Sequence, residues 1–369
     1  MITTPKKNTL ERQTAEILRA QIDQGAWTEW LPGIRTLVKL LQVSSHTVCA
    51  ALRQLRRDGV IVPEKGVGNK IVRKRNRKNG AKPGGDVGML VCGDFHQIPP
   101  ASILWVDHVR ASLAERGKRL RLFDGRAYTR QNPARALKKL ARQHPHQCWM
   151  LLCSSEDAQA WFQKNAVPCV VAGSVYVGID LPCCDVDYRA VCRHAAGLLL
   201  RRGHRRVALL IKRSRRAGDI LSEAGFEEAF ARPGIAVAPP LIWHCNATVG
   251  GVAEAVRQLM AQKPRPTALL VADPFHCLTV IDCLHKLGLD VPRDVSVISR
   301  DHETCHDHLL SRPASYTANP RHFARPLLDM ITTMLDGGMP PARAHYVMPE
   351  FSEGRTVAPP PPENKTPRQ

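Results

Sequence analysis

The first part of the chain places its apolar residues at helical spacing. Two such segments, at residues 10–24 and 34–41, predict two helices. A tight turn follows, and Ser44 is placed to cap a third helix that runs through Arg57, because a serine hydroxyl accepts a hydrogen bond from the first turn of a helix. Two short helices joined by a tight turn are typical of the helix-turn-helix motif.

A short hairpin is predicted after the third helix. The segments V-I-V at residues 60–62 and K-I-V at residues 70–72 flank a K-G-V-G turn, whose glycines suit a tight reversal of the chain. We interpret these two strands as a wing. Residues 1–72 are therefore predicted to form a winged helix-turn-helix domain.

From Asp86 onward, short apolar runs alternate with amphipathic helical segments. The predicted strands are residues 87–92, 119–123, 148–152, 169–172, 206–211, 241–243, 268–271 and 295–299. The predicted helices are residues 103–116, 132–142, 156–165, 188–202, 220–231, 250–262 and 274–287. This alternation is typical of doubly wound parallel sheets in an α/β protein. Its recurrence after residue 184 predicts two lobes within residues 86–358, with a ligand site at the carboxyl ends of the strands.

Length and composition limit the class of protein. With 369 residues, of which 44% are hydrophobic, the chain can bury the cores of two or three domains. It contains no run of about 18 apolar residues, and its start lacks the apolar stretch of a secretory signal, so we expect a cytoplasmic protein without a membrane partner. The 12 cysteines include no C-x-x-C pair, which favours reduced, packed thiols over disulfides or a zinc ribbon.

Positive charge is concentrated near the amino terminus. The chain has 53 Lys and Arg against 33 Asp and Glu, a net charge of +20. Residues 1–85 hold 17 of the basic and 6 of the acidic residues, so they carry +11 of this excess and predict a domain that binds a polyanion. Residues 73–85, basic and then rich in Gly and Pro, are predicted to be a linker, and the proline-rich residues 359–369 a disordered tail.

The predicted winged helix contains a specific set of residues. Its members are Leu31, Pro32, Arg35, Val43, Ser44, Thr47, Val48, Ala51, Leu52, Leu55, Gly59, Gly66 and Gly68. With these residues, positions 8–72 resemble the DNA-binding domain of GntR-type regulators, which implies a double-stranded DNA operator as partner. Three positions depart from that family, because Ser45, Cys49 and Val67 stand where it commonly has arginine.

We expect the third helix to enter the major groove of DNA. The residues expected near base edges are Ser45, His46, Cys49 and Arg53. The residues suited to phosphate oxygens are Arg35, Ser44 and Thr47. The wing turn expected to approach the minor groove consists of Lys65, Gly66, Val67 and Gly68. The alternative is that Ser44 and Thr47 only cap the helix and that the arginines form a solvated face.

Two segments of the second part carry a further pattern. Residues 186–210 contain the turn G-H-R-R, and residues 268–302 place acidic residues after two predicted strands. These segments resemble the effector-binding region of LacI/GalR-type regulators, itself similar to periplasmic sugar-binding proteins. Together the two resemblances imply a GntR-type winged-helix head fused to a LacI/GalR-type, periplasmic-binding-protein-like effector domain, as in bacterial arabinose-repressor-type regulators.

The second resemblance suggests ligand contacts in the second lobe. Asp273 matches an acidic residue that follows a strand, and Asp301 matches the first acid of a Gly-Phe-Asp-Asp step. Carboxylates at strand ends suit sugar hydroxyls, because each carboxylate accepts several hydrogen bonds. Ser222 is a further candidate, since it stands three residues before a Gly-Phe step where the family often has arginine. Helix capping and turn formation are the alternative roles for the acids.

In the first lobe, Asp94 follows a predicted strand and is a third candidate acid. Phe95 and Trp105 are candidates for stacking on a sugar ring, although an aromatic residue near a helix start is more often part of the core. The residues His302, Glu303, Cys305, His306 and His308 include metal-binding types. They lie in an irregular loop without a defined ligand set, so we expect a solvated loop, no metal and no cofactor.

These observations predict a ligand-responsive transcriptional regulator rather than an enzyme. We expect a homodimer, assembled through residues 86–358, that represses carbohydrate-metabolism genes and changes its operator affinity when a small sugar binds. A non-sugar effector, such as a purine or an amino acid, is one alternative. An enzyme fused to a GntR-type head is another, but no nucleophile and base pair or phosphate loop supports catalysis.

Overall fold

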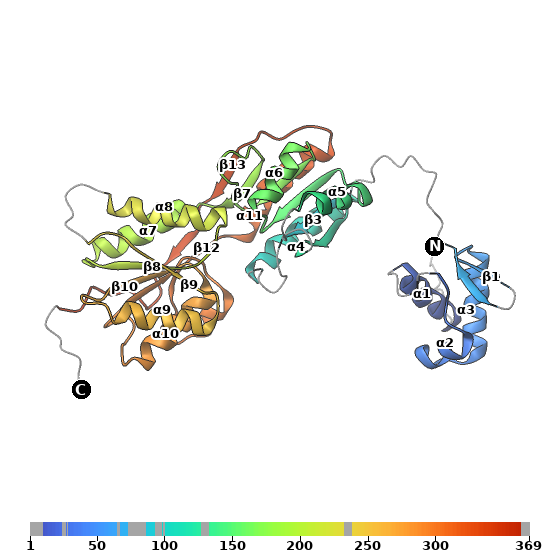
Figure 1. The fold of residues 1–369 in the computed structure, drawn as a ribbon, viewed down its shortest axis with the longest axis horizontal. Coiled ribbons are helices and arrows are strands. Elements are labelled where there is room, and N and C mark those ends of the chain that lie inside the picture. Colours follow the sequence, from blue (N-terminus) through green and yellow to red (C-terminus); the bar gives the residue numbers. More distant parts are fainter. Residues whose placement is uncertain are drawn as a thin grey trace, which may run out of the picture. The chain divides into compact units, whose positions relative to one another are not determined.

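A computed structural model describes the chain as two separate parts. The described residues are 10–23, 27, 29–64, 67–72, 86–92, 98, 100–126, 133–231 and 238–362. The chain divides into two compact units, Met1–Ala81 and Lys82–Gln369, which we call the head and the body (Figure 1). The predicted linker at 73–85 lies outside the described residues. None of the helices in the described ranges is long and apolar enough to span a bilayer.

The head has the predicted winged helix-turn-helix fold. Its elements are α1 (Leu10–Asp23), α2 (Ile34–Leu41), α3 (Ser45–Arg57), β1 (Ile61–Glu64) and β2 (Gly68–Ile71). The two strands pair antiparallel, with Ile61 opposite Ile71, and both side chains join the apolar faces of the helices in one core. Leu18, Leu37 and Leu52 bring the three helices into this core. Burial of the inner face of α3 therefore leaves its outer face free for contacts.

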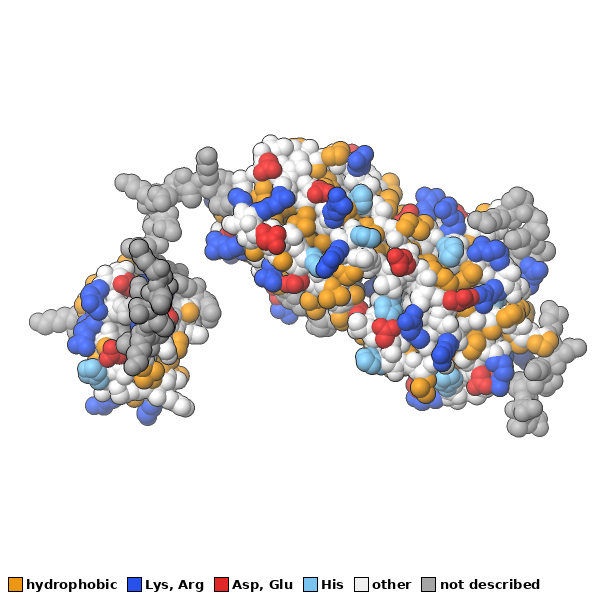
Figure 2. Space-filling model, turned by 180° about the vertical axis from the view of Figure 1, so that it is seen from behind, with side chains coloured by type: hydrophobic (Ala, Val, Ile, Leu, Met, Phe, Trp, Pro, Cys, Tyr) orange, Lys and Arg blue, Asp and Glu red, His pale blue; other side chains and the backbone are white. Residues whose placement is uncertain are grey.

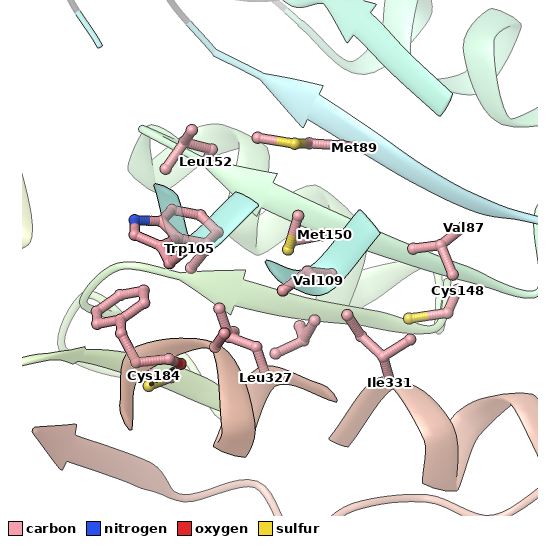
Figure 3. Packing of buried hydrophobic residues seen from close by; sticks show 14 of the residues in the cluster. Val87, Met89, Trp105, Val109, Cys148, Met150, Leu152, Cys184, Leu327 and Ile331 are labelled. Atoms are coloured by element: carbon pink, nitrogen blue, oxygen red, sulfur yellow. Dashed lines mark hydrogen bonds between the residues drawn. The ribbon is translucent and has the colours of Figure 1, made fainter. Parts of the chain in front are cut away.

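The first lobe of the body is a parallel sheet with helices on both faces. Its strands, in spatial order β13-β7-β6-β5-β3-β4, are β3 (Val87–Val91), β4 (Leu120–Asp124), β5 (Cys148–Leu152), β6 (Cys169–Ala172), β7 (Cys183–Val186) and β13 (Ala344–Val347). One face packs against α4 (Ala101–Glu115) and α11 (Pro320–Leu335), where Trp105, Leu327 and Ile331 lie (Figure 3). The other face packs against α5 (Ala134–Gln143) and α6 (Glu156–Lys164). Because both faces are covered, β5 is apolar and buried along its whole length.

The second lobe repeats this arrangement. Its strands, in spatial order β14-β12-β11-β10-β8-β9, are β8 (Val207–Lys212), β9 (Leu241–Cys245), β10 (Ala268–Val271), β11 (Ser296–Ser299), β12 (Ala314–Thr317) and β14 (Glu350–Ser352). All neighbours are parallel except β12 and β14. Helices α7 (Tyr188–Arg201) and α8 (Ala217–Phe230) cover one face, and α9 (Val249–Met260) and α10 (Pro274–Lys286) the other. The predicted α/β class with two doubly wound parallel sheets is confirmed.

The two lobes exchange segments of the chain. The chain passes from the first lobe to the second between β7 and α7, returns between β12 and α11, and crosses again between β13 and β14. Strand β13 pairs with β7, so residues that are distant in sequence complete the first sheet. The periodicity of the sequence did not predict α11 or the strands β7, β12, β13 and β14.

His204 fastens the end of the described chain to the second lobe. Its Nδ1 lies 2.8 Å from the Thr267 hydroxyl, and its Nε2 lies 2.9 Å from the carbonyl oxygen of Ala358. Burial lowers the pKa of His204, so the ring is neutral, with one nitrogen donating and the other accepting. Pro360 lies close to Gly203, so the chain stays against this lobe past residue 358, where the tail was expected to begin.

Replacing His204 with alanine should lower the free energy of unfolding of the chain by about 2–3 kcal/mol, because the Thr267 hydroxyl and the Ala358 carbonyl each lose a buried partner. The matched control is His244→Ala, since His244 Nε2 pairs with Glu223 at the surface. Urea unfolding followed by circular dichroism measures both variants. Equal losses of stability in the two variants would show that the buried hydrogen bonds of His204 stabilise the protein no more than a surface pair does.

Candidate functional site

The outer face of α3 carries the residues predicted to lie near base edges. Ser45, Cys49 and Arg53 follow one another at intervals of four residues, so they lie on one side of the helix, and His46 adjoins them. Ser45, His46 and Arg53 are exposed and Cys49 is half-buried. The fold thus brings these four predicted contact residues onto one accessible strip.

Ser44 caps α3, and Thr47 in the first turn contacts this cap. The Ser44 Oγ accepts a hydrogen bond from the Thr47 amide at 3.1 Å, and the two hydroxyl oxygens lie 2.8 Å apart. Thr47 is buried, whereas Ser44 and Arg35 are exposed. The capping alternative therefore accounts for Thr47 fully, and Ser44 and Arg35 keep free surface for phosphate contacts.

The wing is attached to α3 by a side chain that the sequence analysis had not singled out. The Arg56 guanidinium donates to the Asn69 Oδ1 on β2, with Nε 3.0 Å and Nη2 2.7 Å from that oxygen. This contact fixes the wing against the helix. Val67 and Gly68 are exposed at the wing turn, while Lys65 and Gly66 lie outside the described residues.

A basic hollow lies between α1 and α3. It measures about 590 Å³ and is lined by Glu11, Arg12, Ala50, Arg53, Gln54, Arg56 and Arg57, four arginines against one glutamate. Figure 2 shows Lys and Arg side chains along one side of the head. Because guanidinium groups bind phosphate oxygens through charge-assisted hydrogen bonds, this surface suits the DNA backbone.

In the body, a buried arginine organises the carboxyl edge of the second sheet. Arg300 follows β11, and its Nη1 lies 3.0 Å from Asp219 Oδ1 and 2.9 Å from Ser222 Oγ. Its Nη2 lies 2.9 Å from Asp301 Oδ2, and the Tyr188 ring covers the guanidinium at 4.2 Å. Burial would raise the pKa of Asp219, but the charges of Arg300 and Lys212 outweigh it and lower that pKa. The cluster is therefore a buried, largely neutralised ionic network.

This network differs from the expectation for Ser222. The side chain of Ser222 is fully buried, and its hydroxyl donates to the Gly218 carbonyl while accepting from Arg300. Arg300 stands where the resembled family has the phenylalanine of its Gly-Phe-Asp-Asp step. The guanidinium that contacts Ser222 therefore comes from position 300. Arg300 also donates a hydrogen bond to Oδ2 of the candidate residue Asp301.

The other predicted ligand residues occupy different environments. Asp273 is half-buried and caps α10, its Oδ1 accepting from the amides of Phe275 at 3.0 Å and His276 at 3.1 Å. Trp105 is only 7% exposed and packs against Phe323 in the core of the first lobe, so it offers no free ring face. Asp94 and Phe95 lie outside the described residues.

Polar contacts join the carboxyl edges of the two sheets. The Glu303 Oε2, after β11, accepts from the Ala101 amide at the start of α4 at 3.3 Å. The Arg216 Nη1, after β8, lies 3.8 Å from the Cys153 Sγ, after β5. The strand ends predicted to bind a ligand therefore face one another within the body.

The segment between residues 302 and 308 is not the solvated loop that was expected, because it contains a short helix, η3 (Thr304–His308), and Glu303 and His306 are buried. His302 Nε2 lies 3.4 Å from Asp307 Oδ2, and the buried His306 directs Nε2 to the Pro274 carbonyl at 2.9 Å. Over the described ranges, no group of three or more His, Cys, Asp or Glu side chains is placed to share a metal ion.

Asp185 lies where the chain leaves β7 for the second lobe. Its Oδ2 is 2.6 Å from the Ser174 Oγ, its Oδ1 accepts from the Val186 amide, and its side chain is 8% exposed. Burial raises the pKa of Asp185 to about 6, although the two hydrogen bonds act in the opposite direction. The folded protein therefore binds this proton more tightly than the unfolded chain.

The stability contribution of Asp185 should be largest below pH 4 and be lost as the pH rises through 6, because only the folded state holds the proton in that interval. From the raised pKa we expect Asp185→Asn to remove about 2–3 kcal/mol of pH dependence across this window. Urea unfolding of both proteins between pH 4 and 7.5 measures the difference, with the exposed Asp157→Asn as control. A difference that stays constant with pH would contradict the assignment.

Comparisons with known proteins match both units. Residues 10–71 match the family of bacterial regulatory proteins, gntR family, and residues 196–357 match the periplasmic binding protein-like domain. The transcriptional regulator CelR of Thermobifida fusca is 26% identical over 233 residues, 61% of this chain and 67% of CelR. The transcriptional repressor CytR of Escherichia coli is 27% identical over 176 residues, 47% of this chain and 51% of CytR, so the match spans about half of that repressor.

The fold has solved counterparts. The structure of the transcriptional regulator CelR in complex with cellobiose aligns with a TM-score of 0.65 at 22% identity, covering 85% of this chain and 92% of CelR. At that identity the likeness concerns the fold. It supports the two-lobed α/β fold of the body.

Proposed function

We propose that this chain, which joins a gntR-family DNA-binding domain to a periplasmic-binding-protein-like domain, is a cytoplasmic transcriptional repressor whose affinity for operator DNA changes when it binds a small carbohydrate. It acts as a homodimer assembled through residues 86–358, because two linked heads on two half-sites reinforce each other through effective concentration. No catalytic step is part of this function.

The accessible strip on α3 carries the DNA-binding half of the proposal. It presents Ser45, His46, Cys49 and Arg53 beside a hollow lined by four arginines, a combination that serves base edges and phosphates together. With Ser45 and Cys49 in place of arginine, the strip offers few bidentate contacts to guanine, each of which contributes about 1–3 kcal/mol. We therefore expect modest discrimination among sequences.

The facing strand ends of the body support the effector half. Asp273 and Asp301 lie at the carboxyl edge of the second sheet, and contacts such as Glu303 to Ala101 show that the two edges meet. CelR, whose fold this chain shares, binds cellobiose. A sugar held between the edges would favour one arrangement of the lobes, and that preference is how it would change operator affinity.

The experiment uses the full chain and a duplex selected from a random DNA library. We expect one sugar of a panel of pentoses, hexoses and uronic acids to change DNA affinity by about 5- to 150-fold, as for typical coupling energies. Asp273→Ser should abolish this response and leave DNA binding intact, because serine retains the helix cap but removes the carboxylate. The exposed Asp157→Ser is the control. A response to a purine or amino acid alone would overturn the carbohydrate assignment and leave the repressor.

A further inference from the structure

The turn between β8 and α8 is unusually basic. Within residues 212–216, Lys212, Arg213, Arg215 and Arg216 surround a single serine. Some surface arginines of this lobe have a carboxylate partner, as Arg257 has Glu254 and Arg293 has Asp294. Among the described residues, none of the four cations in this turn forms an ion pair. The turn therefore holds uncompensated positive charge.

Two of these cations lie at the carboxyl end of β8 or directly after it. Arg216 is half-buried and its guanidinium lies 3.8 Å from the Cys153 Sγ of the first lobe. Burial raises the pKa of the Cys92 thiol, and the charge of Arg216 opposes this shift, so the guanidinium also acts on the end of β3. Lys212, also half-buried, acts on Asp219 and on His276, whose pKa is lowered first by burial and also by the lysine charge.

The neighbouring carboxylates are already engaged. Asp219 and Asp301 bind Arg300, and Asp273 accepts two amide hydrogen bonds at the start of α10. Glu303 accepts from the Ala101 amide. The side chains left without a strong partner at this edge are therefore the cations, and the amino end of α8 adds a partial positive charge beside them.

Half-buried cations without a counterion bind an anion well, because a charge-assisted hydrogen bond repays the water they have lost. We propose that the effector is an anionic sugar, carrying either a phosphate or a carboxylate, whose negative group binds Lys212 and Arg216. This inference rests on the proposed function and names the chemical class of its effector.

The test compares matched ligands on the full chain by calorimetry and thermal shift. The series are glucose, glucose 6-phosphate and glucuronate, then ribose and ribose 5-phosphate, with orthophosphate and AMP as references. We expect at least one anionic sugar to bind ten-fold or more tightly than its neutral counterpart. The series also separates phosphate from carboxylate as the recognised group.

The variant Lys212→Gln/Arg216→Gln should lower the affinity for that ligand by ten-fold or more, with Arg213→Gln as the matched control because Arg213 is exposed. Melting temperatures without ligand check that each variant folds. The inference is overturned if neutral and anionic sugars bind equally, if nothing in the series binds, or if the double variant retains its affinity. It is equally overturned if the double variant loses DNA affinity without any ligand, because the cations would then contact DNA.

The outcomes also separate this inference from the proposed function. A neutral sugar that controls DNA binding would leave the repressor proposal standing and remove the anionic effector. AMP binding that depends on Lys212 and Arg216 would keep an anion site and remove the sugar from both proposals. Orthophosphate binding as tightly as any sugar phosphate would likewise exclude recognition of the sugar.

Discussion

The affinity of the chain for duplex DNA should fall about 1,000-fold or more when the salt concentration rises from 50 mM to 200 mM, as it does for proteins that neutralise several phosphates. The reason is the arginine-lined hollow beside α3, together with the +11 charge of residues 1–85. Each phosphate contact releases condensed counterions from DNA, and added salt opposes this release. Fluorescence anisotropy of a labelled duplex over a salt series measures the dependence.

Arg57→Gln should lower the slope of log affinity against log salt by about one, since it removes one phosphate-neutralising charge from the hollow. Arg110→Gln is the matched control, because Arg110 lies on α4 of the body and pairs with Asp107. A salt dependence that is flat, or that changes equally in the two variants, would mean that the α3 surface does not bind the DNA backbone.

Replacing Arg300 with methionine should lower the free energy of unfolding by about 3–5 kcal/mol, the usual effect of removing one partner of a buried ion pair. The loss arises because Asp219, only 6% exposed, keeps its negative charge without its nearest cation, and Ser222 loses a donor. The control is Arg257→Met, since its pair with Glu254 lies at the surface, where such contacts contribute about 0–1 kcal/mol. Urea unfolding compares the variants.

A second change tests the mechanism. Adding Asp219→Asn to Arg300→Met should restore part of the lost stability, because it removes the orphaned charge. If the second substitution makes the protein less stable by the full amount expected of an independent site, the two residues are not energetically coupled.

Most regular elements of both units could be predicted from the sequence, because their signals are local. The third helix of the head, its serine cap and the alternating strands of the body all depend on residues within one or two turns of the chain. Helix α11 and strands β7, β12, β13 and β14 were not predicted, and β13 completes the first sheet only by pairing with β7, far earlier in the chain. No local sequence pattern indicates that two strands so distant in the chain will pair.

The predicted site residues also fall into two groups, those whose position follows from local periodicity and those whose role depends on partners brought together by folding. Ser45, His46 and Arg53 were predicted as an exposed strip because helical periodicity alone decides which face they share. The roles of Ser222 and Trp105 depend on partners brought in by folding, namely Arg300 and Phe323. Sequence spacing could not show that the Ser222 hydroxyl would form hydrogen bonds within the protein or that the Trp105 ring would be covered by other side chains.

The exchange of segments between the lobes also constrains the order of assembly during synthesis. When the ribosome has completed β7, the first sheet still lacks its edge strand β13 and the helix α11 that covers Trp105 and Val109. That apolar face must wait until residues 320–347 emerge, after nearly all of the second lobe has been made. The nascent chain therefore carries an unfinished, adhesive lobe for most of its translation, and this interval is where chaperone binding or aggregation would act.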